Sequence, residues 1–325
     1  MLRFILGLGV VVGSSALARA APVVGGTRVP IGKWRDVVLV INESSTCSGT
    51  LIAPDIVLTA GHCVDAKPIE VLTDTIDYAR PGGDRIAVKW ARAYPNWEHR
   101  YDVGVLMLEH VARGHGRTVA SACTINAALE EPNASVHVVG FGLASSSGDD
   151  ENSALREADL PVIDPFCAMD VACEPSVAPH GEFIAGGRGT DSCFGDSGGP
   201  VYLETPDGPA LAGVVSRGLA LPGAPCGNGG VYVRADKVVA WVQSITHARL
   251  TRTSCGGRAD DGGTGEAEGG GCSSGGSGAG LVIGLGIFAV GATSRRRPRP
   301  DPRGDPRPLD PPSRQAVDVR RGFAA

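Results

Sequence analysis

The sequence contains no cluster of basic residues before position 295, and acidic residues slightly outnumber basic ones over its full length. Its 30 Lys and Arg against 35 Asp and Glu give a formal net charge of −5. This charge argues against a nucleic-acid partner, because proteins that bind nucleic acids concentrate positive charge. No group of His, Cys, Asp and Glu has the spacing of a metal site, so we expect neither a metal nor another cofactor. Aromatic residues make up only 5%, whereas 47 glycines are present. The 325 residues could form one or two domains, and the composition of the tail favours one domain with appendages.

The amino terminus has the layout of a secretory signal peptide. Arg3 supplies a positive start, residues 4–12 form an apolar run, and the sequence Ala-Arg-Ala at 18–20 is a small-x-small cleavage site. The run is too short to span a bilayer as a helix. A buried core strand is the alternative interpretation of this segment. The layout favours a signal peptide over residues 1–20 and hence a secreted protein.

A serine at position 197 lies in the most informative segment of the chain, Gly-Asp-Ser-Gly-Gly-Pro at 195–200. The glycines let other backbone come close to Ser197. A serine hydroxyl is a weak nucleophile at its free pKa, so catalysis requires a base and an acid that orients the base. His62 and Asp102 are the candidates for these two roles. The serine is not in a Gly-x-Ser-x-Gly elbow, which argues against an α/β-hydrolase.

In the chain order His62, Asp102, Ser197, these residues and their flanking motifs resemble the chymotrypsin/trypsin family of serine proteases. Unrelated folds that carry the same three residues use other chain orders, so the order itself is informative. The resemblance covers roughly Val23 to His247. It implies an all-β fold of two antiparallel six-stranded β-barrels with a C-terminal helix, and a serine endopeptidase that acts on protein or peptide substrates.

The strand pattern agrees with that fold class. Short β-branched runs alternate with Gly, Pro and Asp/Ser turns between residues 23 and 250, for example at 36–41, 136–139 and 211–215. Many short strands at near-regular spacing are typical of an antiparallel sandwich or a pair of barrels. Residues 236–247 instead repeat apolar side chains at helical spacing, which predicts one terminal helix.

The resemblance also assigns roles to the catalytic residues. Asp102 would hold the imidazole of His62, which would take the proton from Ser197. The backbone amides of Gly195 and Ser197 would form the oxyanion hole. A catalytically silent binding or adhesion protein on the same fold is the alternative, but relatives of that kind usually lose one of these residues, and this chain keeps them all.

The resemblance places Asp191 at the bottom of the substrate pocket, with Ser216, Gly218 and Gly230 around it. A buried carboxylate needs a cationic partner or water, which predicts cleavage after Arg or Lys. One departure weakens this inference: Arg217 stands where the family usually has tryptophan. We expect this cation either to repel basic neighbours in the substrate or to reach over Asp191.

The expected activation step is also unusual. In the family, cleavage frees an amino group at the position of Val23, and this group forms a buried ion pair with the acid at the position of Asp196. The residue before the cleaved bond is normally Arg or Lys. Here Pro22 precedes it. If signal cleavage follows Ala20, the dipeptide at 21–22 would remain, and a separate activating peptidase would have to remove it from the zymogen.

Nine cysteines fit an exported protein, because disulfides persist in oxidising compartments. The disulfides predicted with the help of the resemblance are Cys47–Cys63, Cys193–Cys226 and Cys167–Cys173. The last is a local bridge, because Ile184 stands where the family usually has a cysteine. The cysteines left over are Cys123, Cys255 and Cys272. Their odd number means that at least one thiol is free or bonded to another molecule.

The composition changes abruptly after residue 250, where Gly, Ser and acidic residues predict a flexible linker. An apolar segment and three arginines follow, which looks like a bacterial carboxy-terminal sorting tail that would attach the protein to the cell surface or membrane. A Gly/Ala-rich disordered tail is the alternative. The predicted regions are a signal peptide (1–20), a pro-dipeptide (21–22), the protease domain (23–250), the linker (251–278), the apolar segment (279–294) and a disordered tail (295–325).

Two acids, Asp74 and Asp77, lie near the loop in which some members of the resembling family bind calcium. Two acids in a turn are usually just solvated, so we assign no metal to them.

Overall fold

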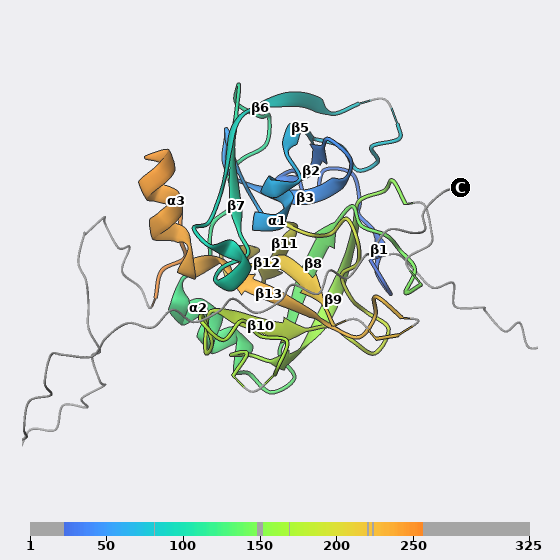
Figure 1. Ribbon diagram of the computed structural model, residues 1–325, viewed down its shortest axis with the longest axis vertical. Coiled ribbons are helices and arrows are strands. Elements are labelled where there is room, and N and C mark those ends of the chain that lie inside the picture. Colours follow the sequence, from blue (N-terminus) through green and yellow to red (C-terminus); the bar gives the residue numbers. More distant parts are fainter. Residues whose placement is uncertain are drawn as a thin grey trace, which may run out of the picture. The chain divides into compact units, whose positions relative to one another are not determined.

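The computed structural model describes six stretches of the chain: 23–80, 82–147, 152–168, 170–219, 221–222 and 224–255. Six strands of the first half close into a barrel in the order β2-β3-β4-β7-β6-β5 (Figure 1). These strands are β2 (Val37–Asn42), β3 (Thr46–Ala53), β4 (Ile56–Thr59), β5 (Pro68–Thr73), β6 (Asp84–Ala93) and β7 (Gly104–Leu108).

The second half forms a second antiparallel barrel. Its strands follow the order β9-β10-β13-β12-β11-β8, and a pairing between β8 and β9 closes the ring. They are β8 (Ser135–Gly140), β9 (Arg156–Asp164), β10 (Glu182–Ala185), β11 (Pro200–Leu203), β12 (Ala210–Gly218) and β13 (Gly230–Arg234), and the short β1 (Thr27–Arg28) adds to β9. The prediction of two six-stranded barrels is therefore confirmed.

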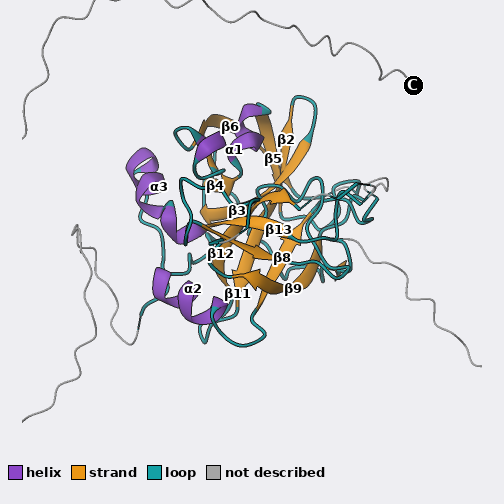
Figure 2. Cartoon of the chain, turned by 60° about the horizontal axis from the view of Figure 1, so that its bottom comes forward, coloured by secondary structure: helices purple, strands orange, loops and turns teal. Residues whose placement is uncertain are grey.

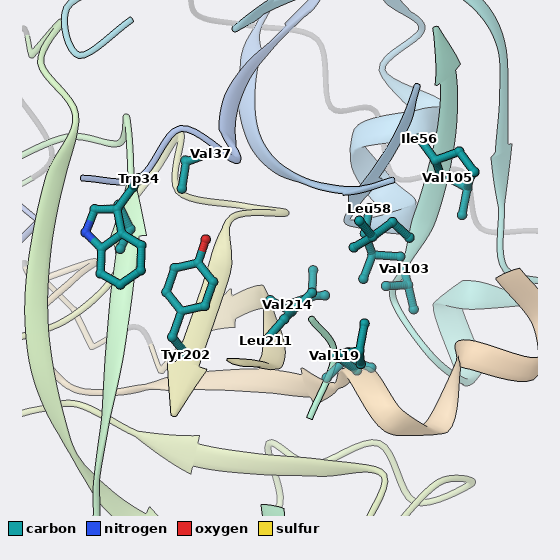
Figure 3. Packing of buried hydrophobic residues seen from close by; sticks show 14 of the residues in the cluster. Trp34, Val37, Ile56, Leu58, Val103, Val105, Val119, Tyr202, Leu211 and Val214 are labelled. Carbon is teal, nitrogen blue, oxygen red and sulfur yellow. The ribbon is translucent and has the colours of Figure 1, made fainter. Parts of the chain in front are cut away.

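The two barrels share a core between them as well as having interiors of their own. Side chains of a strand alternate between its two faces. In β2, Val38 and Val40 accordingly pack inside the first barrel, whereas Val37 and Leu39 pack into the cluster shared with the second barrel. This explains why β2 reads as an almost unbroken apolar run. In the same shared cluster, labelled residues from both barrels converge (Figure 3).

Trp34 and Tyr202 extend this shared core at one edge. Their rings stack with centroids 4.5 Å apart (Figure 3). The Tyr202 hydroxyl donates a hydrogen bond to Asp36, which also forms an ion pair with Arg117. The guanidinium of Arg117 lies over both rings, at 5.4 and 5.0 Å from their centroids. A buried charge is thus paired and covered by aromatic surface on the contact between the barrels.

The helices are short: α1 (Gly61–Asp65), α2 (Ala122–Leu129), α3 (Val239–Thr246) and the 3-10 turns η1 (Trp97–His99) and η2 (Ala235–Lys237). The C-terminal helix predicted over 236–247 is confirmed as η2 followed by α3. The sequence pattern did not predict α2, because Ile125 and Leu129 are the only buried residues in its two turns. Figure 2 shows α2 and α3 on the same side of the strands.

The structure joins the three cysteine pairs named above and adds a fourth. The four disulfides are Cys47–Cys63, Cys167–Cys173, Cys193–Cys226 and Cys123–Cys255. The fourth explains two of the three leftover cysteines by fastening the end of the described chain to α2. The third, Cys272, lies outside the described residues.

Residues 251–255, which the sequence assigned to the start of a linker, lie along the folded domain. Val119 donates a backbone hydrogen bond to Thr251 and accepts one from Thr253, so residues 251–255 lie along the domain instead of leaving it. The physical reason is the bond between Cys123 and Cys255, which no local pattern reveals. The predicted signal peptide (1–20), the predicted pro-dipeptide (21–22) and the predicted segments from 256 onward, including 279–294 and 295–325, lie outside the described residues. Among those described, no helix has the length and apolar character needed to cross a membrane.

Candidate active site

His62 and Asp102 are brought together by the first barrel. His62 lies in α1, just after β4, and Asp102 lies just before β7, the strand paired with β4. The His62 ring nitrogen Nδ1 is 2.9 Å from Asp102 Oδ2, and the His62 backbone amide donates to Oδ1 at 3.0 Å. A Cβ on Gly61 would lie 2.8 Å from Cγ of Trp97, so glycine permits this tryptophan to pack beside the histidine. Because Nδ1 faces the carboxylate, Nε2 is the nitrogen left for a reaction.

The Asp102 carboxylate is held ionised. Burial disfavours its charge, but hydrogen bonds from the ring and amide of His62 and from Ser216 outweigh this effect and lower the pKa of Asp102 below its usual value. Ser216 Oγ donates to Asp102 Oδ2 at 2.7 Å. An ionised carboxylate in this position can stabilise a protonated His62.

Ser197 lies on a loop that both barrels hold in place. Its carbonyl accepts a hydrogen bond from the Ser48 amide at 2.9 Å, and the Gly198 amide donates to Val215 at 2.8 Å. A Cβ on Gly198 would lie 2.1 Å from Thr59 Oγ1, and its φ of +79° also favours glycine. Among the described residues, Ser197 Oγ has no hydrogen bond to His62 Nε2; both side chains line one cavity. Such bonds often close only in the substrate complex.

The backbone amides of Gly195 and Ser197 are oriented by the hydrogen bonds of the carbonyl groups that precede them. The carbonyl of Phe194 accepts from the Leu143 amide at 2.8 Å, and the carbonyl of Asp196 accepts from the Gly199 amide at 2.8 Å. In a trans peptide, N–H and C=O point in opposite directions. The amides of Gly195 and Ser197 are therefore turned to the other side, and the φ of +95° at Gly195 suits a residue without a side chain.

The side chain of Asp196 is completely buried behind this loop. Its carboxylate accepts hydrogen bonds from Gly142 at 2.8 Å and from Cys193 at 2.9 Å. Burial raises the pKa of Asp196 to about 7, and the described residues offer no cation within ion-pair distance of it. Val23 is also fully buried, in the core of the second barrel, although in the full chain its nitrogen is an amide bonded to Pro22.

The catalytic side chains open onto a cavity of about 440 Å³ between the barrels. Ser216 and Gly218 line it, as does Ser192, whereas Asp191 and Gly230 do not.

The Asp191 side chain lies beneath the lining residues and is fully buried. It accepts hydrogen bonds from the amides of Ser192, Gly227 and Gly229 at 2.8, 2.9 and 2.9 Å. Burial outweighs these bonds and raises the pKa of Asp191. A Cβ on Gly230 would meet the hydroxyls of Tyr232 and Ser192 at 2.9 and 3.1 Å.

Arg217 does line the cavity, but its guanidinium does not bind Asp191, which was one of the two alternatives from the sequence. It forms a bidentate ion pair with Glu182, in which Nη1 lies 2.8 Å from Oε1 and Nη2 lies 2.9 Å from Oε2. Sequence reasoning missed Glu182, the buried partner of this cavity residue. The available signal was a lone acid in an otherwise apolar strand. Phe194 was also missed: it is 61% exposed at the cavity and directly precedes the serine motif at 195–200.

The two acids considered for calcium are paired with cations. Asp74 binds Arg35 at 2.9 Å, and Asp77 lies 3.0 Å from Arg80 and 3.6 Å from Arg28. Within the described chain, the two close groups of metal-ligand type each contain a disulfide, which leaves no thiolate for an ion.

Comparison with known proteins shows which family the chain belongs to. The Trypsin family model matches residues 23–242. The chain is 31% identical to coagulation factor XII from Sus scrofa over 248 residues, which is 69% of this chain and 39% of that protein. It is 31% identical to serine protease 56 from Homo sapiens over 247 residues, 71% of this chain and 40% of the relative. The chain therefore belongs to the trypsin family of serine proteases. It spans about two fifths of the length of these curated relatives.

Proposed function

We propose that this chain is a secreted serine endopeptidase. His62 Nε2 takes the proton of Ser197 Oγ as that oxygen attacks a peptide carbonyl carbon. The protonated His62 then gives the proton to the leaving amine, and an acyl-enzyme remains on Ser197. Water, activated by the same histidine, breaks the ester bond and frees the serine. The observation that carries the proposal is the His62–Asp102 pair facing one cavity with Ser197.

The oxyanion of the tetrahedral intermediate would bind the amides of Gly195 and Ser197. Their orientation is fixed before reaction by the carbonyls that Leu143 and Gly199 hold. Donors that do not have to reorganise stabilise developing charge well, and losing one costs about 3–4 kcal/mol of transition-state stabilisation.

Cleavage after Arg or Lys is the specificity that the pocket supports. Asp191 is a buried carboxylate with three amide donors but no cation beside it in the described chain. An arginine or lysine side chain that enters past Ser192 would supply the missing charge. The ion pair with Glu182 keeps Arg217 from competing for this role.

Activation would follow release of the Val23 amino group by an activating peptidase. Val23 is already buried in the second barrel, and Val24 packs against the disulfide of Cys193, whose amide donates to Asp196. Secretion through residues 1–20 and attachment through the tail at 279–294 complete the proposal on sequence grounds, and four disulfides support the oxidising compartment.

The proposal is tested on protein whose amino terminus has been sequenced and found to begin at Val23. Matched peptides that differ only in Arg, Lys or Leu before the cleaved bond are incubated with it and with its Ser197→Ala variant. We expect cleavage after Arg and Lys by the first protein and none by the second. Faster cleavage after Leu would overturn the specificity, and activity in protein that begins at Ala21 would overturn the activation step.

A further inference from the structure

The guanidinium of Arg217 uses all five of its N–H donors. Nε and Nη2 donate to the Ala172 carbonyl at 3.1 and 2.7 Å, and Nη1 and Nη2 donate to the two oxygens of Glu182. The fifth N–H, on Nη1, donates to Ser216 Oγ at 3.1 Å. The Glu182 side chain is 1% exposed and that of Arg217 is 37% exposed. A planar guanidinium whose five donors are all hydrogen-bonded has one orientation. Glu182 and the Ala172 carbonyl therefore fix the direction of the N–H that Arg217 donates to Ser216.

Ser216 has a single hydroxyl proton, and its two polar neighbours leave one way to place it. Arg217 can only donate, and an ionised Asp102 can only accept. The hydroxyl therefore accepts from Arg217 and donates to Asp102 Oδ2, which lies 2.7 Å away. Consecutive hydrogen bonds polarise one another, so the bond from Arg217 strengthens the one that Ser216 makes to the carboxylate.

We propose that Arg217 is a positioning residue for the catalytic acid. It acts through Ser216, and Glu182 holds it in place. The chain of contacts runs from Glu182 through Arg217 and Ser216 to Asp102, whose Oδ2 also faces the ring of His62. With two donors on that oxygen, the carboxylate cannot rotate away from the imidazole. This inference rests on the proposed function, because it assigns a role within that catalytic set.

The test is a double-mutant cycle between Arg217 and Ser216. Arg217→Met removes all five donors but keeps an unbranched stem, and Ser216→Ala removes the relay. The substrate is a minimal N-acetyl-aminoacyl p-nitroanilide with the side chain that the wild type cleaves fastest, so that it lacks the residues that would contact the cavity rim. Titration with a fluorophosphonate measures the concentration of active sites. Because kcat is calculated per active site, misfolded protein does not lower it.

We expect Arg217→Met to lower kcat by about 3- to 10-fold, with KM changed by less than about twofold. In the Ser216→Ala background the same substitution should change kcat by less than about twofold. Arg35→Met is the matched control, because it makes the same exchange at an ion pair with Asp74 that lies outside the catalytic set. Its kcat should stay within about twofold of wild type.

An equal loss in both backgrounds, or an unchanged kcat in Arg217→Met, would contradict the proposal. If Arg217→Met yields no titratable sites, Arg217→Lys replaces it in the same cycle. A lysine ammonium reaches Glu182 but has no fork to hold Glu182 and Ser216 together. A wild-type protein that neither reacts with the fluorophosphonate nor turns over would instead refute the proposed function, so the two failures are distinguishable.

Discussion

Replacing Asp196 with asparagine in the full chain should remove a pH dependence of folding stability. The carboxylate is fully buried, and burial raises its pKa from an ordinary 3.8 to about 7. Two amides, those of Gly142 and Cys193, compensate only part of the cost of ionising it. Before cleavage ahead of Val23, no amino group is present there to supply the balancing charge. The full chain therefore carries this cost at neutral pH.

The sign follows from proton binding. Between pH 3.8 and about 7 the folded chain holds a proton on Asp196 that the unfolded chain has lost, so stability falls as pH rises through this window. Full ionisation by pH 8 corresponds to roughly 4 kcal/mol of lost stability. The side-chain oxygen of asparagine can still accept a hydrogen bond from one of the two amides, but its NH2 group faces the other amide, which is also a donor. This mismatch lowers the free energy of unfolding by about 1–3 kcal/mol at every pH.

The assay is urea unfolding between pH 4 and pH 8 in a Ser197→Ala background, which prevents self-cleavage. We expect the free energy of unfolding of the Asp196→Asn protein, relative to its parent, to rise by roughly 4 kcal/mol across this range. Asp207→Asn, in an exposed turn, is the matched control. Parallel pH profiles for Asp196→Asn and its parent would refute the reasoning. A chain that begins at Val23 should lose the dependence, because its amine supplies the cation.

Three further outcomes follow from individual contacts. Replacing Cys123 and Cys255 with serine should lower the free energy of unfolding by up to roughly 5 kcal/mol, because the bridge closes a loop of 132 residues; urea titration measures this, and an unchanged midpoint contradicts it. Gly198→Ala should lower kcat by roughly 100-fold, since its Cβ would collide with Thr59 and displace the serine loop; wild-type kcat in the folded variant would be the opposing result. Asp191→Asn should lower kcat/KM for Arg and Lys peptides by roughly 100-fold while sparing Leu peptides, and an equal loss on all three would count against its assigned role.

The sequence predicted those parts of the molecule that short, local patterns specify. The motif around Ser197 and the runs of β-branched residues indicated the barrels, and the chain order of His62 and Asp102 indicated which fold. Strand β2 read correctly because both of its faces are buried, one in each core cluster.

Features that depend on long-range contacts were missed or left open. Glu182 binds Arg217 from a strand 35 positions away, and no local pattern marks an acid whose partner is so distant. The pairing of Cys123 with Cys255 spans 132 positions and moves the end of the domain beyond 250. The role of Arg217 could not be settled from sequence, because repulsion, contact with Asp191 and pairing with an unseen acid were equally compatible with its position.

The central claim, that Ser197 is a nucleophile activated by His62, is tested most directly by covalent labelling. Protein beginning at Val23 is treated with a fluorophosphonate and digested, and mass spectrometry locates the adduct. We predict one adduct per molecule on Ser197, and a greatly slowed reaction in the Asp102→Asn variant, in line with the roughly 10⁴-fold loss of turnover known for that change in this family. Labelling at another residue, or no labelling of correctly folded protein, would contradict the account.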